Sequence, residues 1–393
     1  MYYLNDLGIL CTLGVGKPGV SAALLDRRAP LPEPAALFQH RGPYTVGAVE
    51  ADLPPLPPGL ERFECRNNRL AHAALEQIRE AVSRAFVRHG AERIGVVMAT
   101  STAGIDESEK AVRAHRQDGI YPQGYQAVQG QLGGLGEFVA ASLECAGPVY
   151  TLSTACSSSG NALLSARRLL AMDLVDAVVV GGVDSLCEMT LQGFGALEAQ
   201  SRSHCRPFTA GRDGINLGEA VAIFLMSREP AAIRFMGGAG SSDAHHISAP
   251  HPEGQGALRS MSGALQDAGL TPAEIGYLNL HGTATPHNDA METRAVNALF
   301  GESVPCSSTK SMTGHTLGAA GALELGLCWL LLSMDEHWRL PPSLYLADRD
   351  PALAPVLLVD PDSMAYRRPR HCMSNSFAFG GSNVSLIIGV ANE

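Results

Sequence analysis

Two short apolar runs on either side of one helix-length segment constrain the fold of this chain more than any other feature. Residues 147–153 and 177–182 have the length and apolar character of buried strands, and residues 157–172 between them have helical spacing. A strand–helix–strand unit of this length sets its two strands parallel in one sheet. The pattern therefore predicts an α/β protein.

The same alternation continues along all 393 residues. We expect further helices at 68–89, 256–268, 289–300 and 319–334, and further strands at 93–100, 220–226, 275–280, 304–307 and within 372–390. The proline-rich residues 28–59 predict a surface loop. We divide the chain into an N-terminal α/β half, residues 1–230, and a C-terminal α/β half, residues 231–393.

Composition and charge exclude several classes of protein. The formal net charge of −10 argues against a general nucleic-acid binder, which needs a basic face. Nine cysteines at irregular spacing, without a CxxC pair, fit neither a disulfide framework nor a metal site. The first residues lack the basic region of a signal peptide, and no apolar run has the length of a membrane span. We expect a reduced, cytoplasmic protein that does not cross a membrane.

Cys156 lies in the segment STACSSSG, where a predicted strand gives way to a predicted helix. Its small neighbours leave room for a substrate, and a helix N-terminus favours the thiolate and supplies N–H groups for an oxyanion. A buried structural cysteine fits the same local pattern. The segment alone leaves both interpretations open.

Two histidines in the second half follow predicted strands. His281 begins the segment HGTATP, at the place where α/β proteins put ligand-binding groups, and Thr283 and Thr285 add hydroxyls there. His315 ends the segment KSMTGH, just before a glycine-rich helix start. A histidine that caps a turn, and glycines that let helices pack closely, explain these segments equally well.

Other residues near these segments suggest an organised site. Glu324 lies in an apolar helix, where a carboxylate is costly without a partner, and Lys310 is the candidate partner. In the segment NSFAFGGSN, Phe377 and Phe379 flank one small residue, which suits an aromatic gate but also a turn with two core phenylalanines. One cysteine with two histidines suggests that an enolate is stabilised, because a serine-type triad pairs its nucleophile with one histidine and a carboxylate.

The segments TACSSS, HGTATP, KSMTGHTLGAAGALE and NSFAFGGSN, in this order, resemble the elongating β-ketoacyl-acyl carrier protein synthases of the thiolase superfamily. The resemblance covers nearly the whole chain. It implies a thiolase-like fold, in which two similar βαβ halves form a layered α/β/α/β/α core. It also implies an acyltransferase that condenses malonyl-carrier protein with an enzyme-bound acyl group, with loss of CO₂, in fatty-acid, polyketide or polyene-type chain elongation.

The resemblance assigns expected roles to residues of this chain. It implies that Cys156 accepts the acyl group, and that His281 and His315 promote decarboxylation. It further implies an orienting pair, Lys310 and Glu324; hydroxyls that bind the arm, Thr283, Thr285 and Ser248; and a gate and oxyanion site at Phe379, with Phe377 beside it. No tightly bound cofactor and no metal are implied, because phosphopantetheine arrives on the carrier protein.

Partners are expected on the same basis. Arg66, Arg69 and Arg202 lie in segments that resemble the family's docking patch for the acidic acyl carrier protein, although ordinary solvated arginines look the same in a sequence. We expect a dimer with a second copy, or with a related synthase or chain-length-factor subunit, built by the first half.

Two departures and two rival interpretations bear on this expectation. Ala378 stands where the family often has glycine, which restricts the gating loop, and the N-terminal YLNDLGILCTLG lacks the family's strand ending in TGLG. A non-catalytic chain-length factor typically lacks the cysteine and often a histidine that this chain keeps. A thiolase-type acyltransferase has a second catalytic cysteine near its C-terminus, and Cys372 lacks that setting.

Overall fold

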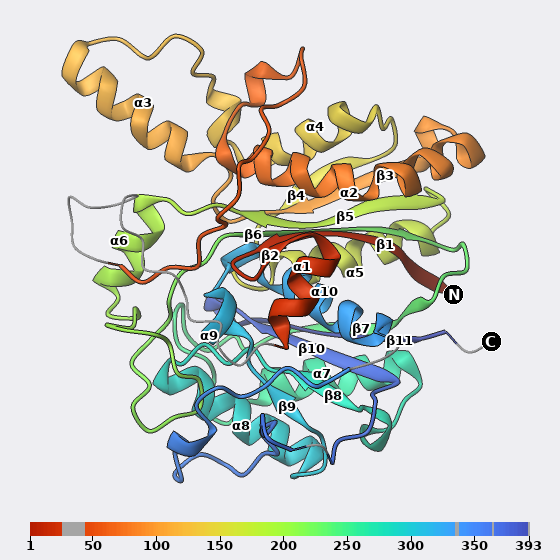
Figure 1. Cartoon of the computed structure of the whole chain (residues 1–393), viewed down its shortest axis with the longest axis vertical. Helices are drawn as coiled ribbons and strands as arrows, with labels where there is room; N and C mark the ends of the chain where they lie inside the picture. Colours follow the sequence, from red (N-terminus) through yellow and green to blue (C-terminus); the bar gives the residue numbers. More distant parts are fainter. Residues whose placement is uncertain (26–43, 335–337, 364, 392–393) are drawn as a thin grey trace.

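The computed structural model describes residues 1–25, 44–334, 338–363 and 365–391. Within these residues, eleven strands form one mixed sheet, in the order β4-β3-β5-β6-β1-β7-β11-β10-β8-β9 with β2 beside β1 (Figure 1). The strands are β1 Tyr2–Cys11, β2 Gly14–Val15, β3 Ile94–Ala99, β4 Val149–Leu152, β5 Ala177–Asp184, β6 Ala220–Ser227, β7 Ile233–Ser242, β8 Tyr277–Asn279, β9 Cys306–Ser307, β10 His371–Phe377 and β11 Ser382–Val390. The α-helices are α1 Gly16–Leu24, α2 Arg66–His89, α3 Ile105–Asp118, α4 Leu132–Leu143, α5 Ser158–Ala171, α6 Glu188–Ala196, α7 Gln255–Ala268, α8 Pro286–Phe300, α9 Lys310–Thr313 and α10 Ala320–Ser333.

The two halves of the sheet repeat one strand order. With the short β2 set aside, the first half runs β4-β3-β5-β6-β1, and the second runs β9-β8-β10-β11-β7. If the five strands of each half are numbered in the order in which they occur along the chain, their order across the sheet is third, second, fourth, fifth, first in both halves. In both halves the second strand pairs in parallel with the third and fourth, whereas the fifth strand pairs antiparallel with both its neighbours. Between the two repeats, β6 ends at Ser227 and β7 begins at Ile233.

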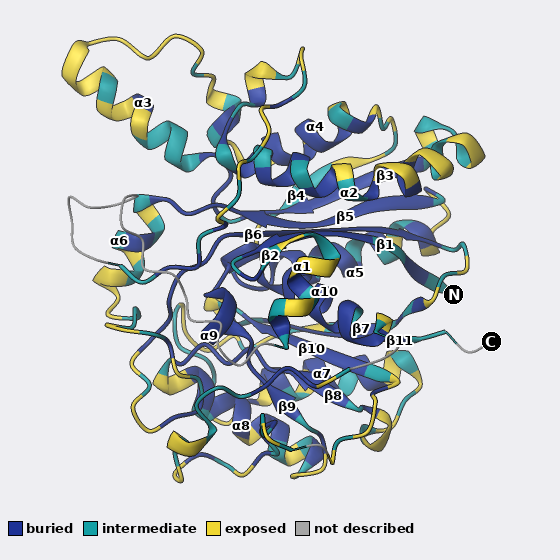
Figure 2. Ribbon diagram, in the orientation of Figure 1, coloured by how far each residue is buried: buried dark blue, intermediate teal, exposed yellow. Residues whose placement is uncertain are grey.

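The two half-sheets and three layers of helices form a five-layered molecule. α5 and α10 lie between the two half-sheets, α2 and α4 cover the outer face of the first, and α7 covers the outer face of the second with α8 beside it. Of the 14 residues of α10, all but Trp329 and Ser333 are buried, which explains why its sequence is apolar on every side. The strands and these central helices form the buried interior (Figure 2). The predicted α/β/α/β/α arrangement is therefore correct.

Most predicted elements are present, with ends within three residues of those expected. The sequence analysis missed the strands β1, β2 and β7 and the helices α1, α3, α4, α6 and α9. Glycines obscure two of these: α4 reads LGGLGEFVAASL and β7 reads IRFMGGAGSS. The N-terminal strand is present as β1, although its sequence departs from the family's pattern. Tertiary contacts override weak local preference in these segments.

The proline-rich loop prediction is only partly correct. Its residues 28–43 lie outside the described residues. In the remainder, Val46, Val49 and Leu56 are buried rather than at the surface. The N–H of Val49 donates to the buried carboxylate of Glu219, at 2.9 Å. The sequence did not predict that these three residues are buried, because they do not recur with the period of a helix or a strand.

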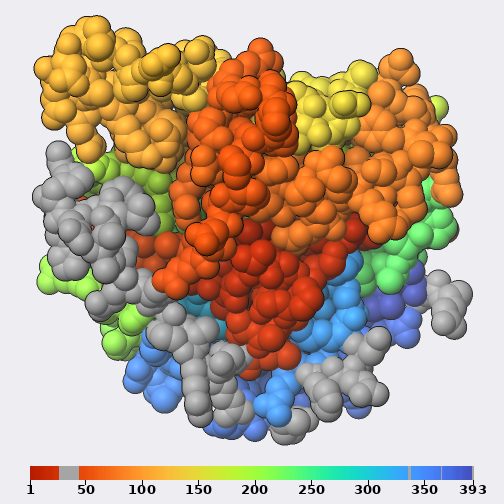
Figure 3. All heavy atoms as spheres, turned by 45° about the horizontal axis from the view of Figure 1, so that its top comes forward, coloured from red at the N-terminus to blue at the C-terminus, as the bar shows by residue number. Residues whose placement is uncertain are grey.

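α3 projects from one corner of the molecule (Figures 1 and 3). Only Ala111 of its 14 residues is buried, so its sequence has no apolar stripe. The exposed side chains of this region include the apolar Val112, Ile120 and Tyr121. Apolar side chains are therefore exposed in this region, and β4 forms the edge of the sheet in the first half.

Candidate active site

Cys156 lies in the tight connection between β4 and α5. Ala155, just before it, has a φ of 52°, a left-handed conformation that is strained for a residue with a side chain. Hydrogen bonds hold the turn: Ser158 Oγ donates to the Ala155 carbonyl at 2.5 Å and accepts from the Thr154 N–H at 2.8 Å. The turn places Cys156, which is 6% exposed, at the floor of a pocket.

His315 contacts the sulfur of Cys156 directly. Its Nε2 lies 2.9 Å from Sγ. The main chain is fixed on both sides, because the His315 N–H donates to the Asn216 carbonyl and the His315 carbonyl accepts from the Gly218 N–H. The segment before β6, in the first half, therefore positions a histidine of the second half.

His281 completes the cluster from the loop after β8. Its N–H and that of Gly282 each donate to the buried carboxylate of Glu292, at 2.7 Å. Its ring lies 5.3 Å from that of His315, at an interplanar angle of 83°. The sulfur of Cys156 and one nitrogen of each ring lie within 4.8 Å of one another. Two loops of the second half and one turn of the first half thus converge on a single point.

Lys310 and Glu324 form a buried ion pair behind this point. Lys310 Nζ contacts Glu324 Oε1, and it also lies 3.4 Å from Nδ1 of His281. Both side chains are about 99% buried, with 1% and 2% exposed. The contact is the one that the sequence led us to expect. Because the ammonium group donates to Nδ1, a neutral His281 carries its proton on Nε2, which faces the pocket.

Burial sets the protonation of the cluster. It lowers the pKa of His281 and of His315 well below the ordinary value, and the charge of Lys310 lowers both further. Burial raises the pKa of Cys156 to about 12, although Lys310 and the N–H of Phe379 act in the opposite direction. Burial therefore opposes both the thiolate and the imidazolium forms, and it acts against the thiolate that a helix N-terminus is expected to favour. Burial also raises the pKa of Glu324 to about 7, against the effect of Lys310.

The segment after β10 closes the pocket. Phe377 is buried at the end of the strand, whereas Phe379 is 38% exposed and its ring lies 5.8 Å from that of Phe194. The backbone N–H groups of Phe379 and of Cys156 itself face the cysteine sulfur closely enough to lower the pKa of its thiol. Ala378 has φ −110°, so alanine fits this conformation without strain, and Gly380 takes the left-handed φ of 83°.

The pocket above the cluster has a volume of about 520 Å³. Thr283, Thr285 and Ser248 line it, as the resemblance implies for residues that bind the arm. The hydroxyl oxygens of Thr283 and Thr285 lie 2.9 Å apart. Hydroxyls therefore extend from the buried cluster towards the surface.

The three arginines expected to dock a carrier protein have different surroundings. Arg66 makes a two-pronged contact with the buried Glu219 and also donates to the Val49 carbonyl, so its charge is engaged. Arg69 pairs with Glu64 at 2.5 Å, with 39% of its side chain exposed. Arg202 is exposed on the segment that follows α6, and it lines a neighbouring hollow that shares Glu198, Asp213 and Ile215 with the active-site pocket.

Sequence reasoning missed several buried polar residues that hold the cluster in place. Glu292 supports His281, and burial raises its pKa to about 7. Asp289, one turn earlier on α8, accepts from the N–H groups of Phe208 and Ala284. Two acids three residues apart on the inner face of a helix that packs on a sheet are unusual, and this spacing was the available signal.

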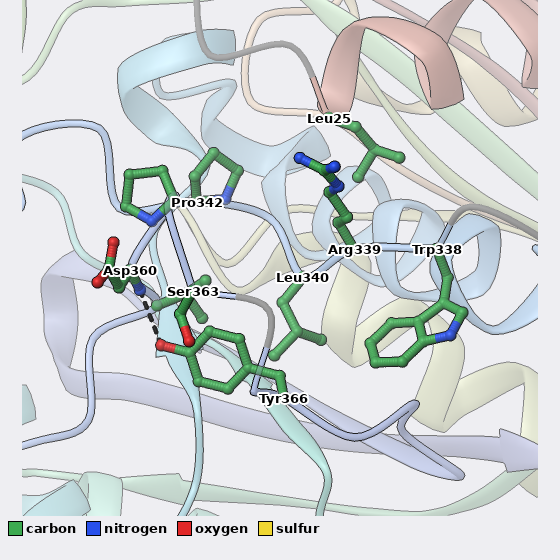
Figure 4. Close-up of a pocket in the computed structure, with 10 residues that line it drawn as sticks. Leu25, Trp338, Arg339, Leu340, Pro342, Asp360, Ser363 and Tyr366 are labelled. Carbon is green, nitrogen blue, oxygen red and sulfur yellow. Dashed lines mark hydrogen bonds between the residues drawn. The ribbon is translucent and has the colours of Figure 1, made fainter.

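A second pocket lies elsewhere on the molecule, and Figure 4 shows it. It has a volume of about 280 Å³, and Trp338, Arg339, Asp360 and Tyr366 are among the residues that line it. The Tyr366 hydroxyl accepts from the Asp360 N–H at 2.8 Å. Among the described residues that line it there is neither cysteine nor histidine, so these residues do not offer the chemistry of the Cys156 cluster.

Comparison with known proteins places the chain in a family. A model of the N-terminal domain of β-ketoacyl synthases matches residues 40–232, and a model of their C-terminal domain matches residues 233–346. These matches span more than half of the chain, which therefore belongs to the β-ketoacyl synthase family. It is a condensing enzyme of the acyltransferase class, as the sequence predicted.

Relatives and solved structures agree with this assignment. The chain is 34% identical to 3-oxoacyl-[acyl-carrier-protein] synthase 2 of Staphylococcus aureus over 355 residues, which cover 82% of this chain and 84% of that protein. It is 32% identical to nodulation protein E of Rhizobium meliloti over 401 residues, which cover 98% and 97%. A chain from the complex of the ketosynthase ApeO with its chain length factor ApeC, from Xenorhabdus doucetiae, superposes with a TM-score of 0.94 at 46% identity, covering 99% of this chain and 98% of that one. The predicted thiolase-like fold is confirmed.

The helices of the described residues also bear on membrane insertion. None of them is both long enough and apolar enough to cross a bilayer.

Proposed function

We propose that this chain condenses malonyl-carrier protein with an acyl group held on Cys156, with loss of CO₂. The convergence of the Cys156 sulfur with one nitrogen each of His281 and His315, at the floor of a pocket open to the surface, carries the proposal. A hydrolase triad needs one histidine backed by a carboxylate. Behind the imidazole of His281 stands Lys310, whose positive charge stabilises a negatively charged oxygen in the pocket.

In the first step the acyl group moves to the enzyme. The sulfur of Cys156 attacks the acyl thioester carbon, a new S–C bond forms, and the bond to the arm's sulfur breaks. The thiol proton passes to the departing arm, while Nε2 of His315 stays in contact with the cysteine sulfur. The N–H groups of Cys156 and Phe379 stabilise the oxyanion that forms in between.

In the second step the malonyl thioester loses CO₂. The bond to the carboxyl group breaks, and its electron pair forms an enolate whose oxygen His281 and His315 stabilise by hydrogen bonds. Lys310 holds the proton of His281 on Nε2, the nitrogen that faces this oxygen. The enolate carbon then attacks the carbonyl carbon of the acyl-enzyme, the bond from that carbon to the Cys156 sulfur breaks, and the released thiolate takes a proton from water.

The acyl and malonyl groups arrive on the phosphopantetheine arm of acyl carrier protein. Thr283, Thr285 and Ser248 would hydrogen-bond the arm inside the pocket. Staphylococcus aureus synthase 2 is named for the acyl carrier protein, which supports this partner. We place the reaction in the cytoplasm, where free cysteines stay reduced.

Intact-mass measurement tests the proposal. Wild type, Cys156→Ala and Cys145→Ala are incubated with short, long, unsaturated and aryl acyl-carrier proteins, and then with malonyl-carrier protein. We expect an acyl adduct on wild type and on the control Cys145→Ala, no adduct on Cys156→Ala, and a product extended by two carbons. Absence of adduct and product on wild type, with a chain-length-factor partner added, would sink the proposal and favour a non-catalytic role.

We also propose that the exposed surface of α3 and the edge strand β4 bind a chain-length-factor subunit. The apolar side chains of Val112, Ile120, Tyr121 and Val149 are 37% to 71% exposed there. An unprotected sheet edge beside exposed apolar side chains is typical of an interface. A ketosynthase that superposes at 46% identity was solved with its chain length factor, which supports this choice of partner over a second copy.

Co-purification tests the partner. Ile120→Glu together with Tyr121→Glu should abolish co-purification of the chain length factor, because two charges would be buried without partners. Val87→Glu is the matched control, because the Val87 side chain on α2 is 91% exposed. This variant should still co-purify with the chain length factor. Equal loss in both variants, or in neither, would place the interface elsewhere.

Among the docking arginines we propose Arg202 as the main contact with carrier protein, with Arg69 next. Arg66 contributes least, because its guanidinium group is engaged by Glu219. Arg202→Ala should raise the KM for carrier-bound substrates several-fold and leave the KM for acyl-pantetheine unchanged. Arg84→Ala, on another surface, is the control and should change neither KM value.

A further inference from the structure

The rim of the active-site pocket carries two histidines that the catalytic steps do not use. We propose that His246 and His287 bind the phosphate of the phosphopantetheine arm, as a two-imidazole anion site at the pocket mouth. The inference rests on the proposed function, because it identifies how the same pocket recognises the far end of its carrier-bound substrate.

Burial along the pocket gives its direction. The cluster of Cys156, His281 and His315 is buried. Thr283 is buried as well, Thr285 and Ser248 are half-buried, and His246 and His287 are exposed, yet all of them line the same pocket. An arm whose thioester reacts at Cys156 therefore passes the hydroxyls first and the histidines last. The phosphate is the group at the far end of the arm, so it reaches the rim.

The hydrogen bonds of His246 fix its donor. Its Nδ1 accepts from the N–H groups of Ser248 and Ala249, each at 3.2 Å, and lies 3.4 Å from the Ser248 hydroxyl. Because Nδ1 accepts, even the neutral ring carries a proton on Nε2. His246 thus presents an N–H donor at the rim without being charged. His287 reaches the same pocket from the first turn of α8.

The acidic residues that line the pocket come from both halves of the chain and differ in their hydrogen bonds. Glu198 and Asp213, from the first half, line the pocket, and both are exposed. Asp243, from the second half, lines it too, but its oxygens already accept from Asn383 Nδ2 at 2.8 Å and from the His251 N–H at 3.0 Å. Asp213 likewise accepts from Ser201 Oγ at 2.6 Å and from the Arg202 N–H at 3.1 Å. The histidines that line the pocket all belong to the second half, so an anion that they bind lies on that side of the mouth.

A comparison of two small substrates tests the site. Acyl-pantetheine and acyl-phosphopantetheine differ only in the phosphate, so the ratio of their kcat/KM values for loading Cys156 isolates its contribution. His246→Asn keeps an acceptor near the position of Nδ1 for the loop N–H groups and removes Nε2; His287→Ala removes the second ring. We expect wild type to prefer the phosphorylated substrate, and the double variant to lose about tenfold of that preference.

His245→Gln is the matched control, because His245 is exposed on the same loop but does not line the pocket. It should keep the wild-type ratio. A ratio unchanged in the double variant, including the case in which both substrates slow equally, would overturn the phosphate site. A wild type that forms no acyl adduct with either substrate or with acyl-carrier protein would refute the proposed function instead.

Discussion

The two halves of this molecule use one strand order for different tasks. In the first half, the connection after the third strand, β4, carries Cys156 and leads into α5. In the second half, the matching connection after β9 carries Lys310 and His315 and leads into α10. Because α5 and α10 lie side by side in the central layer, the two connections meet, and the sulfur of Cys156 contacts Nε2 of His315.

The connections after the second strand differ more. After β8 stands His281, supported by Glu292. After β3 stand Thr100 and Thr102, whose hydroxyls donate to the buried Asp184 at 2.8 Å. The same place in the repeat holds a reactive group in one half and a structural network in the other. The comparison teaches that the repeat supplies positions, and that the side chains at each position differ in chemistry. In the reaction that we propose, the first half holds the acyl group and the second half stabilises the enolate.

The strongest test removes the contribution of the first half. Cys156→Ala should lower condensation at least about 1000-fold, because the nucleophile is gone, yet it should still release CO₂ from malonyl-carrier protein. Release of radiolabelled CO₂ and product formation, measured in parallel, separate the two activities. Loss of both at once would mean that the halves do not divide the work as described.

Removing the second half's contribution should have the complementary effect. His281→Ala should slow decarboxylation about 100- to 10,000-fold, because the enolate oxygen loses a donor. Acyl loading of Cys156, followed by mass, should fall much less, since His315 keeps its contact with the sulfur. If loading falls as far as decarboxylation does, His281 serves the first step too.

The buried ion pair behind the second half's site should matter for stability. Lys310→Met leaves Glu324 without its partner and should lower the free energy of unfolding by about 3–5 kcal/mol. The double variant Lys310→Met with Glu324→Leu should recover most of this, because no charge remains buried. Denaturant unfolding of the three proteins gives the comparison, and a double variant as unstable as the single one would contradict it.

The acids of the second half should also give stability a pH dependence. Burial raises the pKa of Glu292 and of Glu324 to about 7, so the folded state keeps these protons at pH values where the unfolded chain, near pKa 4.5, has lost them. The free energy of unfolding should therefore fall as the pH rises from about 4.5 to 7. Glu324→Gln should make that slope less steep, and identical slopes in the two proteins would count against the assignment.

The smallest expected effect concerns the gate. Ala378 has an ordinary φ in this conformation, so Ala378→Gly should lower the free energy of unfolding only by about 0.5–1 kcal/mol, through the freedom it gives the unfolded chain. If the gate must reach a conformation that alanine resists, turnover should rise in the same variant. Turnover lower than wild type would show that alanine's restriction favours the reactive conformation.

Much of this architecture was readable from local pattern. Apolar runs with strand or helix periodicity placed β3, α5, β5 and α10 within three residues, because these elements are buried and burial imposes the pattern directly. The sequence did not predict α3 for the opposite reason, because a helix that buries only Ala111 has no apolar stripe. The candidates Cys156, His281 and His315 were recognised because their motifs are long and ordered. The contact between Lys310 and Glu324 was predicted because a carboxylate in an apolar helix needs a partner.

The sequence by itself determined the class of fold, the candidates Cys156, His281 and His315, and the pairing of Lys310 with Glu324. Only the tertiary structure decided that Arg66 is engaged by Glu219, that Glu292 holds His281, and that two histidines line the rim. The physical reason is range. Periodicity and motif record what a residue needs from its neighbours along the chain, whereas a hydrogen bond between residues 66 and 219 depends on where the whole sheet brings them.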